Sequence, residues 1–250
     1  MMFRRAGIPG LLVLLTLLLG WDAWIKFWSS DAPSGWDGGG HEGLITLIRN
    51  HVDWPCHGVF KEWFAGMPYP HFLPPLFHLV AATLSAATGL SSFEAARLIL
   101  TFCILVLPIQ VCFLSRRLAP RNQLGFAMGG VLAAFQVTDF VRGASWGLGL
   151  HGVMQVGLLS YAALLPFWLG AVQILAGPLT PMRVMAGGLM LSATILGNPH
   201  VAIASAMSLA GCLVVRWSWR VALLGLTAVA LSGLWWWPML ARHEFFPTRR

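Results

Sequence analysis

The stretch "RLILTFCILVLPIQVCFLSRRLAPR", residues 97–121, decides the fold. Its apolar run covers residues 97–114, and about 17–25 apolar residues let one helix cross the hydrocarbon core of a bilayer. Arg116, Arg117 and Arg121 follow the run directly, where basic residues hold the cytoplasmic end of such a helix. The stretch therefore predicts a helix that spans a membrane.

Further apolar runs lie on both sides of this stretch, near residues 8–25, 72–90, 124–141, 153–176, 184–215 and 221–240. The composition agrees, because 57% of the 250 residues are hydrophobic and only 10% are charged, whereas soluble domains carry about 25% charged residues. We therefore expect an all-α fold: a polytopic bundle of transmembrane helices that forms a single domain over residues 1–250.

The run at 184–215 contains its own break. As one helix it would be about 48 Å long, too long for one crossing without strong tilt. The segment "LGNPH", residues 196–200, interrupts it. Pro199 has no amide proton and its ring clashes with the preceding turn, so we expect two short helices that meet at Gly197–His200.

The formal charge of +7 does not indicate nucleic-acid binding. All but two of the 16 basic residues are Arg, and they stand singly or in pairs between apolar runs, as orientation signals do. The four cysteines include no CxxC pair, so neither a disulfide framework nor a zinc knuckle is indicated.

The same arginines predict the topology. Arg4 and Arg5 precede the first run and no small-x-small cleavage site follows it, so we expect an uncleaved helix with a cytoplasmic N-terminus. Simple alternation of spans would place Arg116 and Arg117 outside. The conflict disappears if residues 72–114 cross only once, with one segment short or re-entrant. The cytoplasmic face then holds Arg4, Arg5, Arg116, Arg117, Arg121, Arg183, Arg216 and Arg220. The loop 26–71, "RGASWGLGLHG" (142–152) and "GNPH" (197–200) share the opposite face.

The first outer loop, residues 26–71, contains two segments with amphipathic patterns. "EGLITLIRN" (42–50) places its apolar residues on one helical side and turns Arg49 and Asn50 away. "HGVFKEWFAGM" (57–67) does the same, with Lys61 and Glu62 on the polar side. Both patterns predict short helices that lie in the membrane interface, where Trp and Phe prefer to sit.

Ionisable residues gather in and around this loop. Six of the nine acidic residues and five of the eight histidines lie between residues 22 and 78, and such residues at a membrane face suggest a site because they are costly at membrane depth. The acidic residues are Asp22, Asp31, Asp37, Glu42, Asp53 and Glu62, and the histidines are His41, His51, His57, His71 and His78.

Asp37 is the sharpest candidate for a catalytic residue. Gly38, Gly39 and Gly40 follow it and allow a ligand to approach the backbone closely. The helix that begins near His41 would direct its amide-rich end to the same place, which favours an anion there. Asp37 is therefore either a general base beside a phosphate leaving group or a turn residue that caps this helix.

The roles of several other polar residues each have two interpretations. Two groups have metal-ligand side chains, His41 with Glu42 and His51 with Asp53 and His57. Neither has a recognised spacing such as HExxH, so no metal is assigned and a divalent ion stays open. Arg97 either pairs with Glu94 on the same helix or holds a lipid phosphate. His151 and His200 interrupt apolar runs beside Gly and Pro, as packing residues or as substrate contacts.

The order of motifs resembles the GT-C superfamily of polytopic membrane glycosyltransferases. An N-terminal helix precedes "DGGGH" (37–41), "GMP" (66–68), "YPHFLPPL" (69–76) and "GLSSFEAARL" (89–98). Within that superfamily the chain is most similar to uncharacterised prokaryotic membrane proteins, some labelled as membrane domains related to 6-pyruvoyl-tetrahydropterin synthase. That similarity also rests on "HGVMQVGLLSYAALLPFWL" (151–169), "LGNPH" and "LWWWPMLARHEFFP" (234–247).

The resemblance implies sugar transfer from a polyprenyl-phosphate donor at the extracytoplasmic face of a prokaryotic plasma membrane. Asp37 would act as the base or assist it, with Glu42 and His41 beside it. Arg97 would contact the donor phosphate. The expected substrate contacts also include Tyr69, His71, His151 and His200. The resemblance implies two partners, the lipid-linked sugar and the bilayer, and it implies no binding of nucleic acid.

The chain departs from the family pattern in two ways. Its loop has no adjacent Asp-Glu pair, and the chain ends at "PTRR" (247–250) soon after its last apolar run, so we expect the N-terminal part of a longer protein or a natural truncation.

Two other functions stay open. A transporter or flippase needs polar residues along a path through the membrane, and Asp139 is nearly the only acidic residue inside a run. The second of these functions is that of a non-catalytic membrane scaffold.

Overall fold

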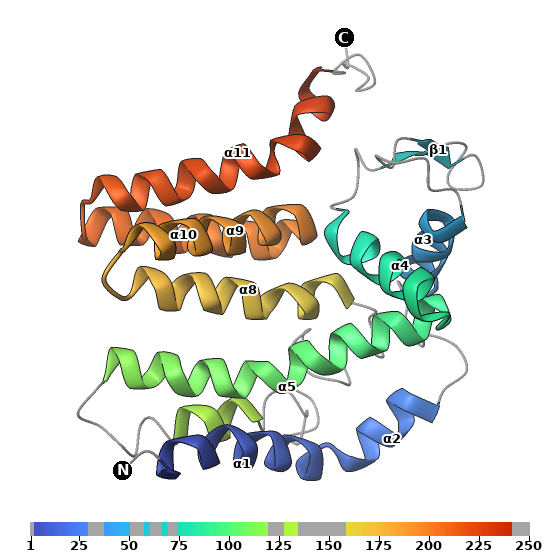
Figure 1. Cartoon of the computed structure of the whole chain (residues 1–250), viewed down its shortest axis with the longest axis horizontal. Helices are drawn as coiled ribbons and strands as arrows, with labels where there is room; N and C mark the ends of the chain where they lie inside the picture. The colour runs from blue at the N-terminus through green and yellow to red at the C-terminus, as the bar shows by residue number, and fades with distance from the viewer. Residues whose placement is uncertain are drawn as a thin grey trace.

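The computed structural model describes residues 3–29, 38–50, 58–60, 67–69, 75–119, 128–134 and 159–241. Apart from short turns and connections, these residues are helical or belong to one short two-stranded ribbon, which confirms the all-α prediction. Figure 1 shows the long helices stacked in the order α1, α5, α8, α9 with α10, and α11, with α2, α3 and α4 to one side. The helices are α1 (Phe3–Leu19), α2 (Trp21–Ser29), α3 (Gly38–Asn50), α4 (Leu76–Thr88), α5 (Ser92–Leu118), α8 (Leu159–Leu175), α9 (Pro181–Gly197), α10 (Pro199–Val215) and α11 (Trp219–Ala241).

Helix α5 carries the stretch that decides the fold. It begins before the apolar run, because the Ser91 side chain accepts a hydrogen bond from the Glu94 N–H and the Glu94 carboxylate accepts one from the Ser91 N–H, which together form a capping box. By length and composition α5 is the one helix among the described residues that is able to cross a membrane alone, with a mean hydropathy of 2.5. The bent pair α1 and α2 passes the same test only when it is taken as one span.

The first predicted span, 8–25, is not one straight helix. The chain bends by 73° between α1 and α2, at Gly20. Trp24 folds back across the bend, and its Nε1–H donates to the Thr16 carbonyl at 3.3 Å. Burial of Trp24 and Phe27 against the core explains the bend, since a straight continuation would carry these rings away from it.

The predicted break near Pro199 is confirmed. Asn198 ends α9 and is the N-cap of α10, and its Oδ1 accepts hydrogen bonds from the N–H groups of His200 and Val201. The two helices then pack on each other, with the buried Thr194 and Ser205 hydroxyls 2.9 Å apart. Proline lacks the backbone N–H that a continuous helix would use as a donor, and the Asn198 side chain accepts from two N–H groups at the start of the new helix.

Of the two helices predicted within residues 26–71, one is confirmed as a helix and the other is wrong. Residues 42–50 are helical within α3, but its apolar residues Leu44, Ile45 and Ile48 are buried against the protein core, not presented to a membrane surface. The prediction of an interfacial helix at 57–67 is wrong at both ends. Strands β1 (Gly58–Phe60) and β2 (Met67–Tyr69) pair antiparallel there, with Val59 opposite Pro68.

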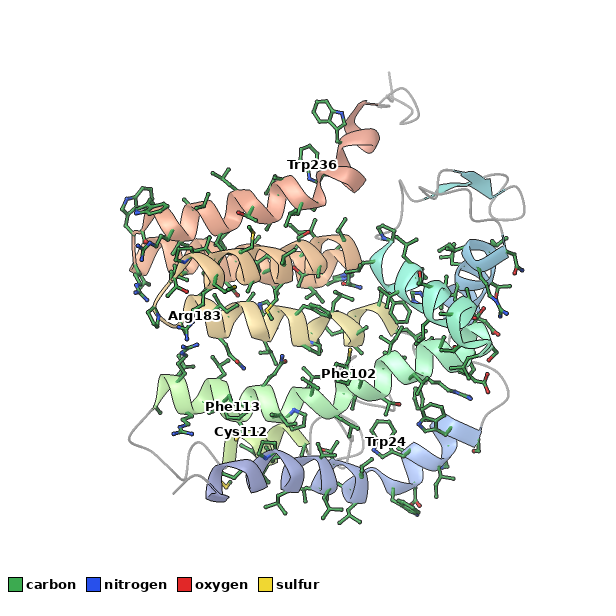
Figure 2. All side chains as sticks on the ribbon, viewed as in Figure 1. Trp24, Phe102, Cys112, Phe113, Arg183 and Trp236 are labelled. Atoms are coloured by element: carbon green, nitrogen blue, oxygen red, sulfur yellow. The ribbon has the colours of Figure 1, made fainter. Side chains whose placement is uncertain are left out.

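Close helix contacts hold the bundle together. The helical residues 128–134 lie between α1 and α5, where a Cβ at Gly130 would come within 3.0 Å of both Leu12 and Cys112 (Figure 2). Helices α5 and α8 are joined by side-chain amides: Gln110 donates to the Pro166 carbonyl at 3.0 Å, and Gln173 donates to the Gln110 carbonyl at 2.7 Å. Interhelical polar bonds of this kind stabilise bundles that lack water between their helices.

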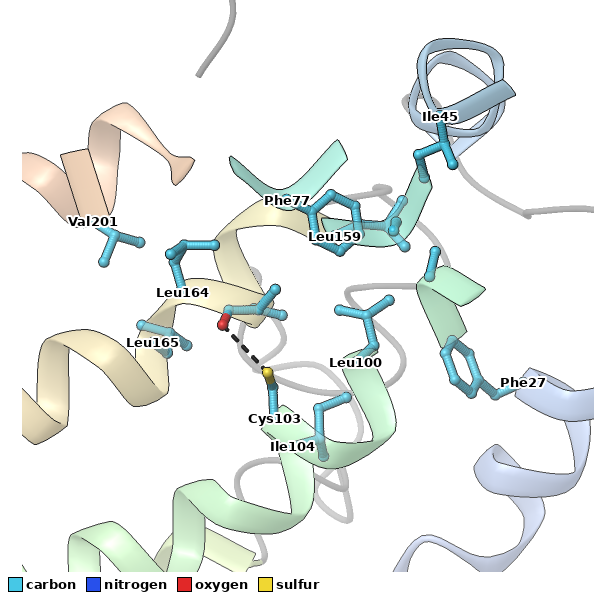
Figure 3. Packing of buried hydrophobic residues seen from close by; sticks show 14 of the residues in the cluster. Phe27, Ile45, Phe77, Leu100, Cys103, Ile104, Leu159, Leu164, Leu165 and Val201 are labelled. Carbon is cyan, nitrogen blue, oxygen red and sulfur yellow. Dashed lines mark hydrogen bonds between the residues drawn. The ribbon is translucent and has the colours of Figure 1, made fainter. Parts of the chain in front are cut away.

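One hydrophobic core joins the two sides of the bundle. Figure 3 shows Phe77 of α4 beside Leu159 of α8, with Leu100 and Ile104 of α5 below them. The Cys103 thiol donates to the Ala163 carbonyl at 3.3 Å within this core. A second core joins α8, α9 and α11.

Helix α8 runs from one end of the bundle to the other. Its first turn meets the α9–α10 junction, where Asn198 donates to the Ser160 hydroxyl at 3.2 Å. We call this the site end, and the starts of α4 and α10 lie there with α8. The last turn of α8 meets the end of α5, where Arg117 donates to the Gln173 carbonyl. We call this the arginine end.

Candidate functional site

Two histidines from distant parts of the chain meet at the site end. His41 lies in the first turns of α3 and His78 in the first turn of α4. Nδ1 of His41 is 2.8 Å from Nε2 of His78, and the two rings are stacked with their centroids 5.0 Å apart. His78 is only 2% exposed, whereas His41 is half-buried. The pair therefore has one ring held by the core and one ring nearer the surface.

The contact fixes what the pair is able to do chemically. A hydrogen bond between two imidazole nitrogens needs one N–H donor and one lone pair, so one of the two contacting nitrogens carries a proton. When His41 donates from Nδ1, its Nε2 carries a lone pair and is a base. A proton taken up at His41 Nε2 then strengthens the bond to His78, because the donor ring has become a cation.

The surroundings of the pair include an aromatic ring and the starts of two helices. The Phe77 ring lies edge-on to both histidines, with its centroid 6.0 Å from that of His41. A Cβ at Gly39 would meet nothing within 4 Å, so there is open space beside the start of α3. Helix α4 begins after Pro75 without a side-chain cap. Uncapped first-turn amides and the positive end of a helix dipole favour an anion.

The predicted site residues are only partly brought together. Glu42 follows His41 in α3 and is half-buried. Tyr69 lies in β2, where it pairs with Gly58. Three predicted residues lie outside the described residues: Asp37, which directly precedes α3 in the sequence, His71 and His151.

Arg97 joins α5 to α2. It is 5% exposed, its Nη1 donates to the Trp28 carbonyl at 3.4 Å, and its guanidinium lies 3.9 Å from the centroid of the Phe93 ring. Glu94, the expected ion-pair partner, uses its carboxylate in the capping box with Ser91. These contacts are those of a residue that fastens two helices, and its role in binding a phosphate stays a prediction.

His200 is exposed at the start of α10. The alternative that it is a buried packing residue is therefore wrong. Its backbone N–H is capped by Asn198, and its contact with substrate stays a prediction.

The sequence alone does not indicate His78 as a site residue. It falls inside the apolar run 72–90, where a histidine ordinarily reads as a packing residue. Burial of a titratable ring in an apolar helix costs free energy unless the ring has a polar partner. That cost is the feature of the sequence that could have pointed to His78, and its partner is His41. Within the part of the chain that the structure describes, no group of three or more His, Cys, Asp or Glu side chains is placed to hold a metal ion.

No protein-family model, curated protein or solved structure matches this chain in the comparisons with known proteins.

Proposed function

We propose that the protein is a membrane-embedded glycosyltransferase of the GT-C type, which moves a sugar from a polyprenyl-phosphate donor to an acceptor at the site end. The observation that carries the proposal is the contact between His41 and His78 at the start of two helices. The motifs around these residues and the chemistry of a paired base support it.

Membrane embedding is supported by the outer surface of the bundle. Large apolar side chains are exposed on α1, α2, α4, α5, α8, α9, α10 and α11. Phe102 on α5 is 68% exposed and Met207 on α10 is 70% exposed. Soluble monomers rarely expose contiguous apolar surface on this scale, and lipid tails would cover it without cost. Several helices are short for a crossing, and 17 residues span about 25 Å, so the bundle fits a thin or locally compressed bilayer.

In the proposed reaction His41 is the catalytic base and His78 is a positioning residue. The acceptor hydroxyl attacks the anomeric carbon of the sugar, its proton passes to Nε2 of His41, and the bond from the anomeric carbon to the lipid phosphate breaks. His78 holds the His41 ring through Nδ1, and Nε2 is the other ring nitrogen, to which the proton would pass. Asp37, one residue before α3, assists by orienting the acceptor hydroxyl for this transfer.

The leaving phosphate is stabilised by the helix starts. Backbone amides in the first turns of α3 and α4 are the donors that a phosphate oxygen needs. Gly39 leaves room for its approach. A base and an anion site are then adjacent, which is the arrangement that displacement at an anomeric carbon requires.

Donor consumption tests the proposal. Membranes that contain the wild type, Asp37→Asn or empty vector are given a panel of radiolabelled polyprenyl-phosphate sugars, and release or transfer of label is followed with time. Consumption by the wild type alone supports the proposed function. Equal consumption by Asp37→Asn removes that residue from the mechanism, and no consumption by folded wild type favours the scaffold function.

A further inference from the structure

The arginine end of the bundle is built around one short loop. Residues 176–180 connect α8 to α9, and four arginines from three other places in the chain donate to carbonyls in or next to this loop. Nη1 of Arg216 donates to Gly177 at 3.1 Å, Nη1 of Arg183 to Pro178 at 3.0 Å, and Nη1 of Arg220 to Leu179 at 2.8 Å. Arg117 donates to Gln173 in the last turn of α8.

Gly177 makes room for this arrangement. A Cβ at this position would lie 2.5 Å from Nη2 and 2.6 Å from Cζ of Arg117. The guanidinium therefore lies against the bare backbone of Gly177, and any larger residue there would displace it. The loop and its arginines fit each other closely, which separates this cluster from basic residues that merely share a surface.

The cluster carries positive charge without nearby carboxylates in the chain segments that form it. The sequence has no Asp or Glu over residues 95–138 or 140–243. Arg117, Arg216 and Arg220 are exposed and Arg183 is half-buried, at the end of the bundle where Figure 2 labels Arg183. Each guanidinium has five N–H donors and uses one in these bonds to the backbone. The remaining donors and the summed charge favour an anion that accepts several bonds at once.

Exposed apolar residues surround the charged loop. Val214 and Val215 are each 87% exposed, Trp217 is 85% exposed and Met182 is 81% exposed. Trp219 is also exposed, and the Arg220 guanidinium lies 5.5 Å from its ring centroid. Indole rings next to arginines are typical of the level of lipid headgroups.

We infer that the arginine end binds the headgroup of an anionic phospholipid, with the phosphate held by Arg117, Arg216 and Arg220 over the loop 176–180. The arginines supply the bonds to the phosphate, and the exposed valine, methionine and tryptophan side chains meet the glycerol and the acyl chains. A free phosphate would use only the first of these features. This site lies at the opposite end of α8 from the histidine pair, and it goes beyond the proposed transferase activity.

Lipid retention by the purified full chain tests the inference. The protein is equilibrated in micelles with equal amounts of phosphatidylglycerol and phosphatidylcholine, repurified, and the lipid that stays bound is counted by mass spectrometry. We expect the wild type to retain phosphatidylglycerol in clear excess. Arg216→Gln with Arg220→Gln should lower that excess by about fivefold for each arginine, and the double Lys variant should keep part of it because the charge remains.

Two further variants separate the site from general charge and from misfolding. Gly177→Ala leaves every arginine in the chain but displaces Arg117, and we expect it to lower phosphatidylglycerol retention. Arg49→Gln is the matched control, because Arg49 is an exposed arginine that also donates to one backbone carbonyl, that of Leu90. It should retain lipid as the wild type does.

The outcomes distinguish a site for an anionic lipid from a site for a soluble anion and from no anion site. Equal retention of the two lipids by the wild type, or unchanged retention in both Gly177→Ala and the double Gln variant, would overturn the inference. Loss of phosphatidylglycerol in millimolar inorganic phosphate would also overturn it, since the cluster would then be a site for a soluble anion. Lipid retention is measured without a sugar donor, so failure here leaves the proposed activity intact, and failure of the activity leaves this site intact.

Discussion

His41 and His78 are 37 residues apart in the chain, yet Nδ1 of one lies 2.8 Å from Nε2 of the other. Because His78 is almost fully buried, its two contributions, packing and hydrogen bonding, can be separated by substitution. We expect His78→Ala to lower the free energy of unfolding by about 2–5 kcal/mol, the range for emptying a buried side chain of this size. His78→Phe fills the space and should cost only about 1 kcal/mol for the lost hydrogen bond.

Unfolding by denaturing detergent, followed by far-ultraviolet circular dichroism, measures both values. Equal losses in the Ala and Phe variants would mean that the ring is not packed as described. Retention of the fold in His78→Phe is what makes this variant suitable for activity measurements.

Asn198 has a specific structural role at the junction of α9 and α10. Its side chain accepts from two backbone N–H groups and donates to Ser160. Asn198→Ala should therefore cost about 2 kcal/mol, the upper end of the range for an N-cap. Thr180→Ala is the comparison, because Thr180 caps α9 through one N–H only, that of Arg183. A smaller loss for Asn198→Ala than for Thr180→Ala, in the same unfolding experiment, would contradict this account.

Two helix glycines should respond to alanine in opposite directions. A Cβ at Gly197 would collide with the buried side chain of Leu164, whereas a Cβ at Gly211 would meet nothing within 4 Å. We expect Gly197→Ala to destabilise the fold by about 1–3 kcal/mol through overpacking. Gly211→Ala should stabilise α10 by about 0.5–1 kcal/mol, since Ala is the better helix former. Thermal unfolding midpoints measured together for the two variants and the wild type give the signs.

The topology is tested by cysteine labelling at the two ends of α8. Leu118 is 68% exposed at the arginine end and His200 is exposed at the site end. If the arginines face the cytoplasm, Leu118→Cys should resist a membrane-impermeant thiol reagent in intact cells and react after permeabilisation. His200→Cys should react in intact cells, with the unmodified protein as the blank for its native cysteines. Labelling of Leu118→Cys from outside would reverse the orientation.

The sequence was sufficient where a local signal determined the structure. Pro199 predicted the break between α9 and α10, because proline lacks the amide N–H that a continuous helix needs. The 3.6-residue pattern predicts a helix over residues 42–50, which form most of α3. The alternation of apolar runs and arginines also predicted the bundle of apolar helices, although its membrane topology stays a prediction.

The errors came from contacts that no local pattern records. The ribbon of β1 and β2 depends on pairing between two separate segments, with Val59 opposite Pro68. A helical periodicity within residues 57–67 does not record that pairing. The bend at Gly20 depends on burial of Trp24 and Phe27 against other helices. For the candidate site, the neighbours of His41 in the chain indicate a functional residue, whereas His78 becomes a site residue only through a contact between α3 and α4.

The central claim is that the pair of His41 and His78 carries out proton transfer during use of a lipid-linked donor. The most direct test measures kcat and KM of the purified protein in lipid nanodiscs with the donor that the wild type consumes, for the wild type, His41→Gln, His78→Phe and His78→Gln. We predict that His41→Gln and His78→Phe each lower kcat by about 100-fold or more with little change in KM, the scale of lost base catalysis. His78→Gln should recover part of the rate, since its amide reaches the position of Nε2. Wild-type kcat in folded His41→Gln and His78→Phe would contradict the account.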